Sequence, residues 1–187
     1  MSKVWIVLGV IVLAVVIVVG SLVGAYNRLV TLNESTEGAW AQVETVLQRR
    51  YDLIPNLVNT VQGFADQERD VLTEVTRLRS QWGEAQTSNE QAAVANQLEG
   101  ALGRLMIVVE RYPELRSNQN FLALQDELAG TENRIATERR RFNDAVQAYN
   151  TAIQRIPTVL IANVTGFEQR DFFQSVAAAE EAPVVEF

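Results

Sequence analysis

Apolar or small residues fill the stretch from Val4 to Ala25, and this is the strongest pattern in the chain. The stretch reads VWIVLGVIVLAVVIVVGSLVGA and contains no charged residue. As a helix, about 22 residues rise by roughly 33 Å, enough to cross a hydrocarbon layer about 30 Å thick. Because lipid offers the backbone no hydrogen-bond partner, such a segment must be helical in a bilayer. The pattern therefore predicts a transmembrane helix.

The flanks of this stretch are typical of a membrane anchor but leave its orientation open. Trp5 and Tyr26 stand near the two ends, where amphipathic rings mark the headgroup level. Lys3 precedes the stretch and Arg28 follows it, so the flanking positive charges nearly balance and the side of the soluble part stays undetermined. A cleaved signal peptide is the alternative, since residues 23–25 are small, but its apolar region normally has only about 7 to 15 residues.

Beyond the anchor, apolar positions recur at three- and four-residue steps, the spacing of one helix face. In the first segment they are Leu29, Leu32, Thr36, Trp40, Val43 and Leu47. No proline or turn sequence separates them from the anchor, so we expect one helical rod to leave the membrane. Pro55 predicts a helix boundary between Tyr51 and Ile54, with Asp52 as the N-cap. A kinked, continuous helix is the alternative.

Three more segments show the same spacing. The second carries Leu57, Val61, Phe64, Glu68, Val71, Val75, Leu78 and Trp82, before a polar turn over residues 83–90. The third carries Ala95, Leu98, Leu102, Leu105, Val109 and Tyr112, before Pro113. The fourth carries Phe121, Leu124, Leu128, Thr131, Ile135, Glu138, Phe142, Val146, Tyr149 and Ile153, before Pro157. These stripes predict an all-α protein whose anchor continues into an antiparallel four-helix bundle.

Past Pro157 the chain becomes apolar again and ends in an aromatic-rich tail. A disordered tail normally contains few aromatic residues, whereas this one contains Phe167, Phe172, Phe173 and Phe187. We expect the tail to pack on the bundle or on a partner. The predicted organisation is thus an anchor over residues 1–25, a bundle over 26–157 and a tail over 158–187.

Composition narrows the function. The 23 acidic residues outnumber the 16 basic ones and give a net charge of −7, which argues against a nucleic-acid partner. Histidine and cysteine are both absent, so the usual general base, the usual transition-metal ligands and any thiol chemistry are missing. We expect neither an enzyme nor a bound cofactor or metal, and a hydrolase that uses only carboxylates ranks last among the alternatives.

Two acidic residues, Glu68 and Glu138, interrupt the apolar spacing of the second and fourth segments. As facing carboxylates they would form a polar seam that, with Arg139 and neighbouring arginines, binds an ion or a small ligand. The simpler interpretation places them at the bundle edge, where ion pairs fix the register. A di-iron site of the usual kind is excluded, because its Glu-x-x-His motifs need histidine.

Two other patterns have a functional and a structural interpretation. The basic run 139–141 would bind anionic headgroups, or it would simply be a solvated helix face. Gly20 and Gly24 have the small-xxx-small spacing through which membrane helices associate, although glycine is also common in such helices.

Several motifs together resemble the bacterial LemA family. They are YNRLV at residues 26–30, RRYDLIPNLV at 49–58, LQDEL at 124–128, RFN at 141–143, and the pairs at 149–150, 166–167 and 172–173. The resemblance covers nearly the whole chain, with residues 83–97 as its departure. It implies a single-pass bacterial membrane protein with a soluble four-helix bundle. It also implies a link to membrane organelle formation and to membrane-protease systems, and it supplies no catalytic residues.

The leading functional hypothesis is a membrane-anchored, non-enzymatic helical scaffold at the bacterial cell (inner) membrane. Its expected partners are the lipid bilayer, further copies of itself and other membrane proteins. The alternative is an ion- or ligand-sensing bundle that uses Glu68, Glu138 and nearby arginines.

Overall fold

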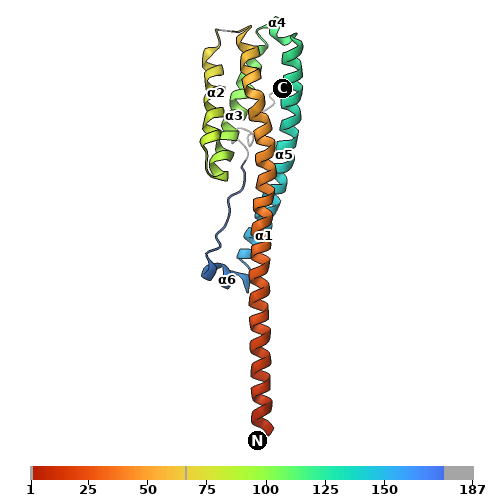
Figure 1. Ribbon diagram of the computed structural model, residues 1–187, viewed down its shortest axis with the longest axis vertical. Helices are drawn as coiled ribbons and strands as arrows, with labels where there is room; N and C mark the ends of the chain where they lie inside the picture. The colour runs from red at the N-terminus through yellow and green to blue at the C-terminus, as the bar shows by residue number, and fades with distance from the viewer. Residues whose placement is uncertain (1, 66, 175–187) are drawn as a thin grey trace, which may run out of the picture. The chain divides into compact units, whose positions relative to one another are not determined.

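The computed structural model describes residues 2–65 and 67–174, and within these ranges the chain forms helices and no strand (Figure 1). The helices are α1 (Ser2–Gln62), α2 (Arg69–Glu84), α3 (Ser88–Val109), α4 (Pro113–Arg116), α5 (Gln119–Ile153) and α6 (Thr158–Thr165). The predicted all-α class is confirmed. The described residues divide into two compact units, one made of residues 2–39 and 141–172 and the other of 40–140 and 173–174.

The first unit has a small core where α1, α5 and α6 meet. Its buried residues are Leu29, Tyr149, Ala152, Ile153 and Ala162, with Leu32, Ile161 and Phe167 partly buried against them. Helix α6 ends at Gly166, whose φ of 77° is the left-handed conformation that glycine adopts most easily. The amides of Gly166 and Phe167 both donate to the carbonyl of Ala162, at 2.9 and 3.2 Å. This cap turns the chain so that the Phe167 ring packs on the core.

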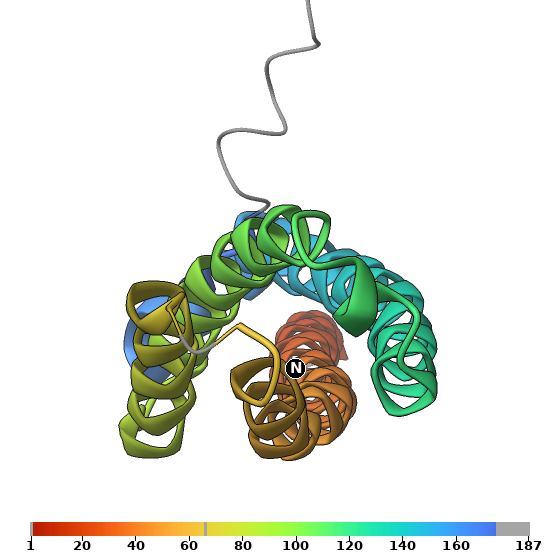
Figure 2. The same cartoon turned by 90° about the horizontal axis from the view of Figure 1, so that it is seen from above.

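The second unit contains the larger core. Seen from above, α2, α3 and the first part of α5 follow one another in an arc beside residues 40–62 of α1 (Figure 2). Its fully buried side chains include Leu47, Ile54, Leu57, Leu78, Leu98, Leu105, Leu115, Phe121 and Ile135. The turn between α2 and α3 falls within residues 83–90 as predicted. There Thr87 and Glu90 form a capping box, in which each side chain accepts the other residue's backbone amide.

The predicted helix boundary between Tyr51 and Ile54 is wrong, because α1 continues through Pro55 to Gln62. Proline has no amide hydrogen, so the carbonyl of Tyr51 loses its partner within the helix. Arg79 of α2 supplies one instead, with its Nε 3.4 Å from that carbonyl oxygen. Leu57 and Val61 beyond the proline are fully buried, and their packing favours continuing the helix.

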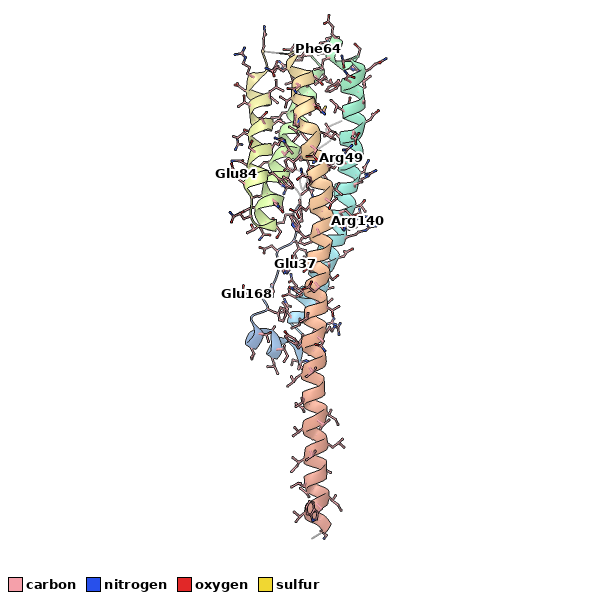
Figure 3. The ribbon with its side chains drawn as sticks, in the orientation of Figure 1. Glu37, Arg49, Phe64, Glu84, Arg140 and Glu168 are labelled. Atoms are coloured by element: carbon pink, nitrogen blue, oxygen red, sulfur yellow. The ribbon has the colours of Figure 1, made fainter. Side chains whose placement is uncertain are left out.

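The second predicted segment is therefore split between the end of α1 and α2, with a turn that begins at residue 63. Phe64, expected in the apolar seam, lies in this turn and is 39% exposed (Figure 3). Glu68 lies at the N-cap position of α2. In α2, the predicted positions Val75, Leu78 and Trp82 are buried, whereas Val71 is only half-buried and its neighbour Leu72 is buried instead. The residues of the predicted stripes in the third and fourth segments are buried, except for Tyr112, Leu124 and Glu138, which are half-buried.

Candidate functional site

The N-terminal third of α1 is an exposed apolar helix. Every side chain from Lys3 to Ser21 is exposed, including Val4 at 69% and Trp5 at 72%. Its most apolar window reaches a mean hydropathy of 3.3, so length and composition allow it to cross a membrane. Helix α3 also passes this test at a mean hydropathy of 1.2, but 39% of its window is buried. We attribute the apolar character of α3 to its place in the core of the second unit.

Two features mark the C-terminal end of that apolar helix. A side-chain carbon placed on Gly20 or Gly24 would meet no described atom within 4 Å, so both glycines present an open surface. Two residues further, the Tyr26 ring is 43% exposed and lies 6.2 Å from the Phe167 ring. Burial begins here: Leu22 is half-buried and Ala25 is buried. The transition from exposed to packed helix thus falls at residues 22–26.

One turn of α1, Arg49 to Tyr51, joins three helices of the second unit. Arg49, which is labelled in Figure 3, forms an exposed ion pair with Glu127 of α5. Arg50 is 5% exposed and pairs with Glu132, also on α5. The Tyr51 ring stacks on Trp82 of α2 with centroids 4.3 Å apart and an interplanar angle of 17°.

Burial shifts the pKa values of two side chains in this turn. It lowers the pKa of Arg50, although nearby Glu99 opposes that effect, and it raises the pKa of Tyr51 well above its ordinary value. The Tyr51 hydroxyl is buried with no hydrogen-bond partner among the described residues. Tyr51 and Arg50 thus contribute to the packing of α1 against α2 and α5.

The predicted polar seam is distributed over two places in the second unit. Glu68 accepts hydrogen bonds from Arg111 Nη2 at 2.9 Å and from the Tyr112 hydroxyl at 3.1 Å, beside the turn between α3 and α4. Burial and then this hydrogen bond raise the pKa of Tyr112. Glu138 lies about 28 Å along α5 from its first residue and is half-buried. Its neighbour Arg139 donates to Asn96 at 3.1 Å and Glu99 at 3.3 Å on α3.

A groove on the described surface is open to solvent and has a volume of about 690 Å³. It lies between the end of α1 and α2 and is lined by Val58, Gln62, Arg69, Leu72, Thr73, Thr76, Arg77 and Ser80. Within residues 2–65 and 67–174, no three acidic side chains converge as a metal site requires. The groove has two arginines but no buried polar group aimed into it.

The C-terminal segment after α6 is held by Arg170 in the first unit. The backbone amide of Arg170 donates to Asn150 Oδ1 at 2.9 Å, and Asn150 Nδ2 donates to the Arg170 carbonyl at 2.8 Å. The Arg170 guanidinium donates to Asn33 at 3.0 Å and pairs with Glu37, both on α1, and lies 5.8 Å from the Tyr149 ring. From the sequence, Asn150 was included only among the motifs of the family resemblance, and Arg170 was missed. An arginine between aromatic residues of a tail was the available signal.

In the second unit, Phe173 continues this attachment. It is 3% exposed, its ring lies 5.9 Å from the ring of Trp40, and the guanidinium of Arg139 lies 4.2 Å above it. Asn96 donates to the carbonyl of Gln174 at 3.0 Å. Phe172 is 47% exposed, and Phe187 lies outside the described residues. The tail residues that we predicted thus have unequal environments, with Phe173 as the buried one.

Comparison with known proteins gives consistent matches. A model described as the LemA family matches residues 39–187. Magnetosome protein MamQ 2 of Paramagnetospirillum magneticum is 30% identical over 200 residues, covering 93% of this chain and 73% of that protein. Magnetosome protein MamQ of Magnetospirillum gryphiswaldense is 28% identical with the same coverage. Protein LemA of Metamycoplasma hominis is 21% identical over 154 residues, covering 82% of this chain and 70% of that protein.

Proposed function

The chain belongs to the LemA family, and from this premise we propose that it is a membrane-anchored, non-enzymatic helical scaffold of the bacterial cell (inner) membrane. One observation carries the proposal: the first part of α1 is apolar, exposed along its whole length and continuous with a packed helix. Residues 4–25 include 15 Val, Ile and Leu side chains. At about −0.3 to −0.6 kcal/mol each, these favour insertion by roughly 5 to 9 kcal/mol.

A soluble protein could not keep such a surface in water. Contiguous apolar patches of more than a few hundred Å² mark an interaction site or cause aggregation. Here the exposed apolar surface surrounds a helix about 33 Å long, which suits the hydrocarbon thickness of a bilayer. We therefore assign the bilayer as its partner, crossed once, with the packed helices arranged outside it as an antiparallel four-helix bundle.

The scaffold role is supported by how the polar side chains are used. Arg50, Arg139 and Arg170 each bind a residue of another helix or of the tail, and Glu68 binds Arg111. No histidine or cysteine exists to add a reactive group. The MamQ relatives are named as magnetosome proteins, and a structural role in a bacterial assembly agrees with that name.

Self-association through the open Gly20 and Gly24 surface completes the proposal, because small residues allow membrane helices to approach closely. Oligomers of this kind would present the bundle surface, or the tail, to other membrane proteins.

Anchoring is tested by fractionating cells that express the full-length chain and washing the membranes with alkaline carbonate. The chain should stay in the membrane pellet, and its release into the wash would refute the anchor.

Self-association is tested by light scattering of the detergent-solubilised chain. Gly24→Ile should lower the oligomer mass, because its side chain fills the close approach. Ala14→Ile, on a different face of the same helix, adds similar apolar volume and should leave the mass unchanged. Equal masses for both variants and the unaltered chain would exclude the glycine surface as the contact.

A further inference from the structure

The segment around α6 exposes an apolar face that the core of the first unit does not use. No charged residue occurs between Arg155 and Glu168. Thr158 and Ala162 are buried on the inner side of α6. On the outer side, Leu160 and Val164 stand one helical turn apart and are 58% and 86% exposed, and Ile156, just before the helix, is 84% exposed.

The position of α6 along α1 is fixed at both of its ends. At its start, a hollow of about 300 Å³ is lined by Gly24, Ala25 and Arg28 of α1 together with Ile156 and Thr158. At its end, Phe167 packs against Tyr26 of α1. Both ends therefore meet α1 at residues 24–28, so α6 runs across the axis of α1, as Figure 1 shows.

That level is where the exposed apolar part of α1 stops. A helix that lies across a transmembrane helix at this level lies parallel to the membrane surface. Interfacial helices bury their apolar face about 5 to 10 Å into the headgroup and acyl boundary. Arg28 and Arg155 also line the hollow at the start of α6. With residues 4–25 in the bilayer, these arginines would stand at the height of the lipid phosphates. Glu168 is the first charged residue after α6, and it lies on the side of α6 that faces away from the N-terminal end of α1 (Figure 3).

We propose that α6 is a second membrane contact, an interfacial helix that inserts Ile156, Leu160 and Val164 into the outer edge of the bilayer. This inference rests on the proposed transmembrane position of residues 4–25. The single helix of the anchor leaves the packed helices free to tilt and rotate about its axis. A contact beside the anchor removes that freedom and fixes the distance between the lipid surface and the part of the first unit outside the lipid, residues 26–39 and 141–172.

The absence of cysteine makes the test direct, because one introduced thiol gives one labelled position. Full-length chains that carry Val164→Cys, Thr165→Cys or Leu13→Cys are labelled with an environment-sensitive nitrobenzoxadiazole dye. They are reconstituted at low density into vesicles of phosphatidylcholine and phosphatidylglycerol. Accessibility is measured with aqueous iodide, and depth with lipids that carry a shallow doxyl quencher on the acyl chain. Thr165 is the matched control, since it is the neighbouring exposed residue on a different face of α6.

The proposal expects iodide to quench the label at position 164 several-fold less than at position 165, and the shallow lipid quencher to show the reverse order. The label at position 13 should be protected from iodide in either case. If positions 164 and 165 are equally open to iodide while position 13 stays protected, α6 does not enter the lipid although the anchor is present. If position 164 is protected from iodide but insensitive to the lipid quencher, protein covers it and the lipid assignment is wrong. If position 13 is open to iodide, the anchor itself fails.

Discussion

The pair Phe172 and Phe173 offers the sharpest test of how the tail is attached. Phe173 is 3% exposed and contacts the Trp40 ring and the Arg139 guanidinium, whereas Phe172 is 47% exposed. Replacing a buried phenylalanine by alanine costs about 3 to 5 kcal/mol. We expect the lower value, about 3 kcal/mol, because a segment near the chain end relaxes more easily than a core helix. For a chain of this size, that corresponds to a decrease in melting temperature of roughly 6 to 12 °C.

The assay is thermal unfolding of the full-length chain in detergent micelles, followed by circular dichroism and by tryptophan fluorescence. Phe172→Ala is the matched control, and it should lower the melting temperature by a third of that amount or less. A double-mutant cycle with Arg139→Leu isolates the contribution of the cation–π contact, for which about 1 to 2 kcal/mol of coupling is expected. Equal destabilisation by Phe172→Ala and Phe173→Ala would refute this view of the tail.

Three further outcomes follow from other contacts. Tyr51→Phe removes a buried hydroxyl that has no partner among the described residues, so stability near neutral pH should stay equal or rise by about 1 kcal/mol in denaturant titrations. Burial raises the pKa of the Tyr51 hydroxyl in the folded chain, so above about pH 10 the unfolded chain releases this proton more readily than the folded chain. The free energy of unfolding should therefore fall as pH rises above about 10, and it should fall less in the phenylalanine variant. Arg50→Ala should destabilise the chain by about 2 kcal/mol or more, because it leaves the partly buried carboxylate of Glu132 unpaired. Arg49→Ala should have little effect, because its ion pair is exposed, and similar melting temperatures for the two variants would contradict the prediction. Asn150→Ala removes both hydrogen bonds to the Arg170 backbone and should accelerate tryptic cleavage after Arg170, with Gln147→Ala as the control; unchanged cleavage would exclude Asn150 as the clamp.

The periodic stripes made much of the helical content predictable. In the third and fourth segments the spacing identified the buried positions because each stripe belongs to one uninterrupted helix. In the second segment the same spacing continued across a turn, so periodicity alone could not locate the end of α1. Gly63 was the better signal, since it stands directly at the start of that turn. For the same reason, the spacing placed Glu68 in the apolar stripe of a helix, although this residue lies just before α2.

Other features depended on contacts that no sequence spacing reveals. The passage of α1 through Pro55 relies on Arg79, which lies 24 positions later and reaches the freed carbonyl of Tyr51. Which of two adjacent phenylalanines is buried depends on where the chain leaves Arg170, and that is fixed by Asn150. Helix α6 did carry a local signal, a proline before it and a glycine after it, but its length of eight residues is too short for periodicity to be decisive.

The uninterrupted course of α1 has a consequence for how the chain acquires its structure during synthesis. Starting a helix is the unfavourable step, with a nucleation constant of about 10⁻³, whereas each added residue extends it at little cost. Once residues 4–25 have entered lipid, they are already helical, and residues 26–39 only have to elongate an existing helix. In the proposed anchored state, membrane insertion thus starts the helix that continues outside the lipid, and it supplies a preformed template before α5 and α6 have left the ribosome.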